Sequence, residues 1–201
     1  MSLEFLNSIA PILTIVIVAA TAIAALVQLK HMRAGNQISA LLAIGEELST
    51  EKYADAADLV RHKLAAAMED PVYREYEIAL TLNRPAPAVD QSYVEIRRAS
   101  VLVGNAYEQL GILVKSGIVD RDMLLDRYNW LILLQWRRLE GVTALSRAAM
   151  GNTMAWENFE YLAVLSEDYL AKHRGGTYPR GVRRMPLANR WPLPESAAPS
   201  R

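Results

Sequence analysis

The sequence predicts an all-α protein: a single N-terminal transmembrane helix followed by a cytoplasmic bundle of about five helices. Three observations support this fold class. An uncharged apolar segment lies near the N-terminus, apolar side chains then recur at helical spacing, and prolines or glycines separate these stretches. Strand-like alternation and Asn-Gly hairpin pairs are missing from the sequence.

The apolar segment Phe5–Leu29 contains no charged side chain, and its core, Ile9–Leu29, is 21 residues long. As a helix this core spans about 31 Å, close to the ~30 Å of a bilayer's hydrocarbon layer. A cleaved signal peptide normally has a basic start and a shorter apolar run, whereas Glu4 is the only charge before this segment. We therefore predict a retained membrane span.

Basic side chains lie directly after the span, at Lys30 and Arg33, and none lies before it. The positive-inside rule then places the N-terminus outside and the rest of the chain in the cytoplasm. The absence of cysteine suits a reducing compartment. Lys30 and Arg33 are also candidate lipid contacts.

Charge divides the chain into an anchor with its basic flank (1–33), a helical domain (34–173) and a basic tail (174–201). Glu46–Leu170 holds 20 acidic and 13 basic residues, whereas Arg174–Arg201 holds six arginines and one glutamate. The tail is rich in Gly, Pro and Arg with few apolar side chains, so we expect disorder.

Besides acting as a solvated tail, this segment could bind anionic lipid or nucleic acid. Each basic residue near an anionic membrane surface contributes about 1 kcal/mol, and the candidate lipid contacts are Arg180, Arg183 and Arg184. Binding of nucleic acid through phosphates is less favoured, because the anchor already holds the tail near lipid.

The predicted helices are bounded by caps and breakers. Ser49 or Thr50 is an N-cap, Gly117 a stop and Asp120 an N-cap. The hairpin of helices 91–116 and 121–150 should form the core, with the last helix packed across it. The span is expected to continue as a juxtamembrane helix over 38–48 or longer. The other expected helices are one after Thr50, a short one in "VYREYEIAL", and 154–173.

One stripe of the 91–116 helix is unusual. Gly104, Glu108 and Gly111 fall on the same side at 3.6 residues per turn, and Asn105 lies farther round. Glycine within a helix costs about 1 kcal/mol relative to alanine, so two of them indicate the close approach of another helix. These four residues form a candidate structural or partner site.

Glu108 would need a partner beside such a crossing, because burying a bare carboxylate is costly. Arg137 and Arg138, across the predicted hairpin, are the expected partners. The alternative is a hydrolase, with Glu108 as general base or metal ligand. Catalysis would need a second acid beside Glu108, and the candidates are Asp120, Asp122 and Asp126. Because Asp120 already has a capping role, we favour ion pairing or capping over catalysis as the role of these carboxylates.

Signatures of common enzymes are missing, including G-x-G-x-x-G, the P-loop and G-x-S-x-G. The three histidines are far apart and never spaced at i,i+4. The sequence therefore predicts no catalytic residue, no cofactor and no metal. A membrane-tethered interaction or scaffolding module, self-associating or with an unidentified protein partner, is the favoured function.

Three segments carry a family resemblance: "NAYEQLGILVKSGIVD" (Asn105–Asp120), the tryptophans Trp130 and Trp136 before "RR", and "WENFEYL" (Trp156–Leu162). Together they resemble the bacterial domain-of-unknown-function family numbered 4760, over roughly Ile38–His173. The resemblance implies an all-α domain attached to a membrane, which we place at the bacterial inner membrane. It carries over no catalytic residue.

Overall fold

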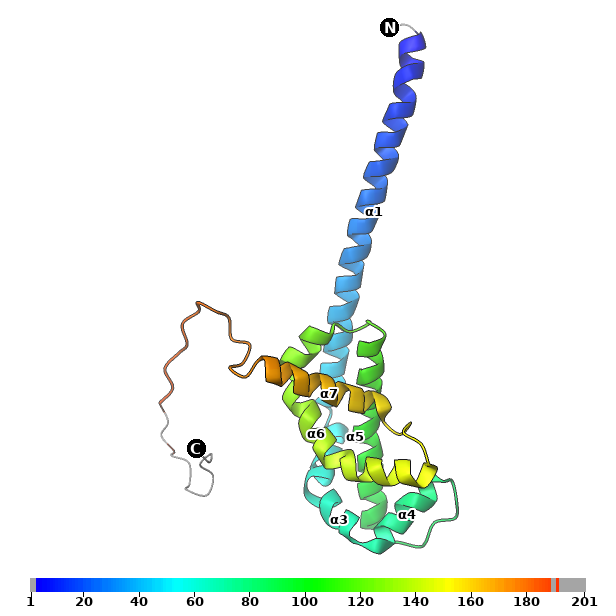
Figure 1. Ribbon diagram of the computed structural model, residues 1–201, viewed down its shortest axis with the longest axis vertical. Coiled ribbons are helices and arrows are strands. Elements are labelled where there is room, and N and C mark those ends of the chain that lie inside the picture. Colours follow the sequence, from blue (N-terminus) through cyan, green and yellow to red (C-terminus); the bar gives the residue numbers. More distant parts are fainter. Residues whose placement is uncertain (1–2, 189–190, 192–201) are drawn as a thin grey trace.

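The computed structural model describes residues 3–188 and residue 191, and all regular structure in this part of the chain is helical. Helix α1 (Leu3–Leu48) is 46 residues long and projects from a packed bundle formed by the helices that follow it (Figure 1). The predicted fold class, a long apolar N-terminal helix followed by a helical bundle, is confirmed.

The outer part of α1 is long and apolar enough to cross a membrane, with a mean hydropathy of 2.1 in its most apolar window. A signal sequence near an N-terminus would share these properties. Large apolar side chains project from α1 with half or more of their surface exposed; in the span they are Leu13, Ile15, Val16, Ile17, Val18, Ile23, Leu26, Val27 and Leu29.

The inner end of α1 belongs to the bundle. Ile44 is only 6% exposed, and Leu41 and Leu48 pack against the same core. Gly45 lies so close to helix α6 (Arg121–Met150) that a Cβ atom there would be 3.1 Å from the Tyr128 hydroxyl. The helix runs without interruption from the apolar segment into the bundle, so the expected continuation of the span through residues 38–48 is confirmed.

Three consecutive segments form one helical rod: α2 (Glu51–Leu59), η1 (Val60–Leu64) and α3 (Ala65–Glu69). Thr50 caps its start by accepting a hydrogen bond from the Tyr53 backbone N–H at 3.2 Å. The middle segment η1 is a π-helix, a widened turn that the apolar periodicity did not predict.

Four further helices complete the bundle, so five helical segments follow α1, as predicted. Gly117 and Gly151 adopt left-handed φ values of 71° and 66°, which end helices at little cost. The Asp120 carboxylate accepts from the Met123 N–H at 2.9 Å and so caps its helix. These helices are α4 (Pro71–Thr81), α5 (Gln91–Lys115), α6 (Arg121–Met150) and α7 (Glu157–Lys172).

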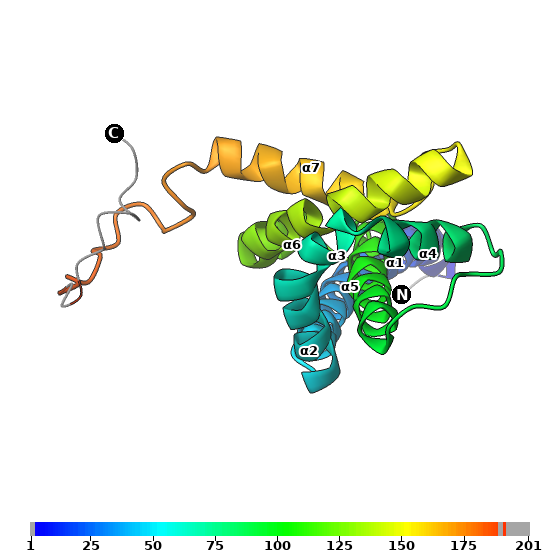
Figure 2. The ribbon, with the colours of Figure 1, turned by 90° about the horizontal axis from the view of Figure 1, so that it is seen from below.

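The last helix packs across the hairpin of α5 and α6, as predicted, but the two helices of the hairpin contact each other less than expected. Helix α7 lies across both α5 and α6 and contacts each more extensively than they contact each other (Figures 1 and 2). The α5–α6 pair is therefore held together largely through α7, because the glycine side of α5 receives α7.

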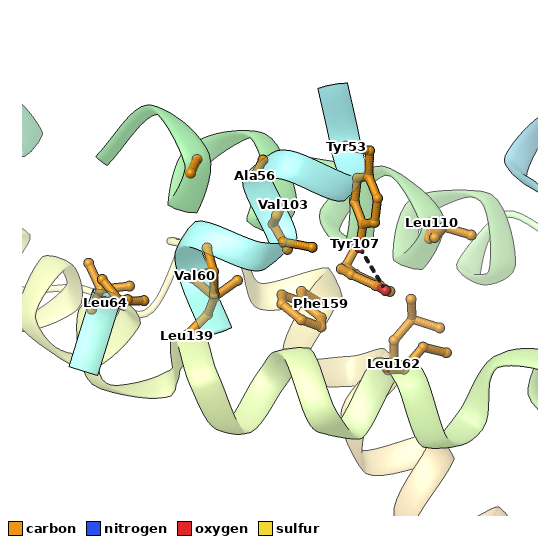
Figure 3. Close-up of a cluster of buried hydrophobic side chains, with 14 of the residues drawn as sticks. Tyr53, Ala56, Val60, Leu64, Val103, Tyr107, Leu110, Leu139, Phe159 and Leu162 are labelled. Atoms are coloured by element: carbon orange, nitrogen blue, oxygen red, sulfur yellow. Dashed lines mark hydrogen bonds between the residues drawn. The ribbon is translucent and has the colours of Figure 1, made fainter. Parts of the chain in front are cut away.

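The core lies where the rod, α5, α6 and α7 meet (Figure 3). Tyr107 and Phe159 are fully buried and stack with ring centroids 4.8 Å apart. The Tyr53 hydroxyl donates to the Tyr107 hydroxyl at 3.0 Å, and burial raises the pKa of both groups, which keeps the pair neutral. Leu139 and Leu162 close the cluster, each burial contributing about 1.5–3 kcal/mol.

Candidate functional site

Glu108 of α5 faces the first turn of α7. One carboxylate oxygen, Oε2, accepts from the backbone N–H groups of Asn158 at 3.0 Å and Phe159 at 2.9 Å. The other oxygen, Oε1, accepts from the Asn158 side-chain amide at 2.6 Å. Glu108 therefore caps α7 from a different helix.

The first turn of α7 needs an acceptor from outside because its own N-cap residue supplies none. Trp156 occupies that position in a left-handed conformation, with φ 49° and ψ 43°, and its side chain makes no capping bond. The first N–H groups of a helix lack partners within it, and negative charge there is favourable. The indole Nε1–H donates to the Asn105 side-chain oxygen at 3.0 Å, which helps to hold Trp156 in place.

Gly104 and Gly111 allow the start of α7, from Trp156 to Phe159, to pack directly against the backbone of α5. A Cβ atom on Gly104 would lie 2.2 Å from a ring carbon of Trp156. A Cβ atom on Gly111 would lie 2.1 Å from the Asn158 carbonyl oxygen. Neither distance is sterically allowed. We call the whole assembly the α5–α7 joint; its members are Gly104, Asn105, Glu108, Gly111, Trp156, Asn158 and Phe159.

A second set of polar contacts, from Arg147 of α6, also holds the start of α7. The Arg147 guanidinium pairs with Glu160 at 2.8 Å and donates to the Ala155 carbonyl oxygen at 3.0 Å. Sequence reasoning did not find it, although Arg147 lies one turn before the Gly151 stop and Glu160 lies in the first turn of α7.

The predicted pairing of Glu108 with Arg137 or Arg138 is wrong. Arg137 is exposed on α6, and the Arg138 guanidinium donates to the Gln135 side chain at 3.4 Å. The physical reason is that α7, not α6, packs against the glycine stripe. The backbone N–H groups of α7, rather than an arginine of α6, therefore donate to the Glu108 carboxylate.

The acids that the hydrolase alternative grouped with Glu108 have other partners. Asp120 caps α6, Asp122 pairs with Arg121 at 3.1 Å, and the Tyr169 hydroxyl donates to Asp126 at 3.1 Å. Both oxygens of Glu108 are occupied by donors, which is a poor arrangement for a general base or a metal ligand. Among residues 13–188 and 191, no group of three or more His, Cys, Asp or Glu side chains could hold a metal ion.

The candidate lipid contacts occupy two places. Lys30 and Arg33 are exposed on α1, directly after the apolar run. The other three, Arg180, Arg183 and Arg184, are exposed in a tail that has neither helix nor strand from residue 174 to 188. The Arg184 guanidinium lies 4.4 Å from the ring centroid of Tyr178. The predicted disorder of 174–201 falls partly on residues 189–190 and 192–201, which lie outside the described residues.

The rod and α5 enclose a second surface, which sequence reasoning missed. Two adjoining cavities of about 460 and 240 Å³ share Leu59 and Glu95. We call them together the rod groove. Small side chains contribute much of its wall: Ala56, Ala66, Ala67, Ser92 and Ala99. The groove borders the π-helical turn, a feature that is enriched at functional sites.

These features define a class: a helical bundle carried on a long apolar N-terminal helix, with its last helix locked by a glycine-flanked glutamate. The chain belongs to the family described as "Domain of unknown function (DUF4760)", whose model matches residues 15–165. The match begins inside the apolar helix and contains both sides of the α5–α7 joint. No curated protein and no solved structure matches the chain.

Proposed function

We propose that the protein is a membrane-tethered interaction module, with α1 as a retained single-span anchor and the bundle in the cytoplasm. The observation that carries this proposal is the continuity of α1. The helix that bears the exposed apolar segment also places Ile44 in the core. A signal sequence functions as a removable leader, whereas this helix is built into the domain that follows it.

The proposed orientation rests on charge. Lys30, His31 and Arg33 follow the apolar run within about one helical turn. They lie between this run and the bundle, and so on the same side of the membrane as the bundle. Positive side chains are retained on the cytoplasmic side of bacterial membranes. The bundle then lies at the inner face, where it meets soluble and membrane-bound partners.

We propose that the rod groove is the partner-binding site and that it binds the apolar face of a helix from a protein partner. Helices approach to 8–10 Å depending on the side chains at the contact, and alanines favour the close end of that range. Ala66 of the rod is exposed in the groove, and Ala56 of the rod and Ala99 of α5 line it as largely buried side chains. Among its lining residues, Lys63, Glu95 and Arg98 supply charges that can fix the register of a bound helix.

An interaction role fits the α5–α7 joint better than hydrolysis does. In the joint, three N–H donors bind the Glu108 carboxylate and direct both of its oxygens to the start of α7 rather than to a substrate. Locking α7 in turn holds the core against which the rod packs, through Phe159 and Val60. A rigid rod is what a binding groove requires.

The test is photo-crosslinking in cells with the full chain. A photoreactive side chain at Ala66, in the groove, is expected to give one discrete crosslinked product in the membrane fraction. The same side chain at Val164, exposed on α7, is the matched control and should give none. A product at twice the chain's mass would identify the partner as a second copy.

A competing variant sharpens this result. Ser92→Arg, at an exposed position of the same cavity, should abolish the Ala66 product, because it fills the groove with a charged side chain. Equal products from Ala66 and Val164, or a product that survives Ser92→Arg, would overturn the assignment of the groove.

A further inference from the structure

The turn between α5 and α6 lies beside α1 just beyond the end of the apolar run. A cavity of about 390 Å³ separates them; its walls include Leu29, Met32 and Arg33 of α1 and Gly117 and Ile118 of the turn. Figure 1 shows this turn at the end of the bundle from which α1 emerges. The α5–α6 turn is thus the part of the bundle nearest to the apolar segment.

Its depth follows from helix geometry. Leu29 ends the apolar run, so it marks the edge of the hydrocarbon layer. The polar interface adds about 5–8 Å on each side of that layer, which corresponds to roughly 3–5 helical residues. The interface therefore extends to about Arg33. Ile118 lines the same cavity as residues before Arg33 (Leu29, Met32) and after it (Asn36, Gln37), so it lies at the depth of the interface.

The composition of the turn suits that position. Ile118 is 50% exposed, although a turn at an aqueous surface is normally polar. Backbone N–H groups of the turn are also satisfied internally: those of Ile118 and Val119 donate to the Leu113 carbonyl oxygen at 3.0 and 3.1 Å. These N–H groups therefore lose no hydrogen bond to water when the turn enters a less hydrated layer.

We propose that the α5–α6 turn is a second membrane contact, with Ile118 inserted into the interfacial layer of a phospholipid bilayer. Arg33, whose guanidinium would lie 3.6 Å from a Cβ atom on Gly117, stands at the same level and contacts lipid phosphate. This inference rests on the proposed function, since it requires α1 to span the membrane.

The second contact has a consequence for the module. A single span leaves a domain free to tilt about its anchor, whereas two contacts fix its orientation. The rod groove then faces a defined direction relative to the membrane. The partner helix would meet it in that direction.

The experiment uses single-cysteine variants of the full chain, which has no native cysteine. Ile118→Cys, Ile23→Cys and Val72→Cys are each labelled with an environment-sensitive fluorophore and reconstituted into phosphatidylcholine–phosphatidylglycerol vesicles. Ile23 is in the apolar segment. Val72 is exposed on α4, a helix that Figure 1 shows at the end of the bundle opposite to the one from which α1 emerges. Lipids carrying a nitroxide near the headgroup serve as quenchers.

We expect a blue-shifted emission at position 118 that the shallow nitroxide quenches, and neither effect at position 72. Blue-shifted emission at 23 reports the span itself, so failure there would overturn the proposed anchor. A normal signal at 23 with water-like, unquenched emission at 118 would overturn the membrane contact of the turn alone.

Discussion

Replacing Gly111 by alanine is expected to lower the free energy of unfolding by about 2–3 kcal/mol, a magnitude typical of overpacking at a closed contact. The added methyl group would lie 2.1 Å from the Asn158 carbonyl oxygen, and a backbone atom cannot rotate away as a side chain can. Helix propensity alone predicts the opposite sign, a gain approaching 1 kcal/mol. The sign of the effect therefore reports the close approach of α7.

Gly141 provides the matched control. It is also within a helix, α6, but its added Cβ atom would meet only the end of Met68, at 3.9 Å. Gly141→Ala should therefore be neutral or stabilising by up to about 1 kcal/mol. Urea unfolding of the full chain in detergent micelles, followed by tryptophan fluorescence, measures both. Equal shifts in the two variants would refute the steric argument.

Glu108→Ala is expected to destabilise the protein by about 2–4 kcal/mol, because hydrogen bonds to a charged group each contribute roughly 1.5–3 kcal/mol and are partly replaced by water. The variant removes all three acceptor contacts at the start of α7. Glu108→Gln keeps one acceptor oxygen and should lose less. Glu140→Ala, at an exposed site on α6, is the control. The same unfolding measurement applies.

A double-mutant cycle tests whether the effect arises at the joint. Asn158→Ala removes the side-chain amide that donates to Glu108, so the double variant should be less destabilised than the sum of the two single variants. Additive effects, or a Glu108→Ala variant as stable as Glu140→Ala, would show that Glu108 does not hold α7. The hydrolase alternative would then regain support.

Much of the fold is readable from the sequence because its signals are local. Thr50 and Asp120 cap helices with their own side chains, and Gly117 and Gly151 end helices through positive φ. Each of these residues acts on backbone groups only a few positions away in the sequence. The long uncharged run at the N-terminus is equally explicit.

The partner of Glu108 could not be read in the same way. Two of its three donors are backbone N–H groups, of Asn158 and Phe159, and backbone groups carry no residue-specific signal. The glycine stripe correctly indicated a close neighbour but not which helix it would be. The left-handed Trp156 also moved the start of α7 from the expected residue 154 to Glu157.

The rod groove escaped prediction for a different reason. It depends on the π-helical turn of η1, and one widened turn changes the direction of every side chain that follows it. Apolar periodicity over 19 residues reports a helix but not its local winding. Cavities between packed helices likewise depend on three-dimensional contacts rather than on spacing.

The central claim, a cytoplasmic module held by a retained span, is tested most directly by the reactivity of Val72→Cys in spheroplasts, in a chain without other cysteines. A membrane-impermeant maleimide should leave the variant unlabelled in intact spheroplasts and label it after lysis. The intact full-length chain should stay in the membrane pellet after carbonate extraction. Labelling before lysis, or a shortened chain released from the pellet, would contradict the account.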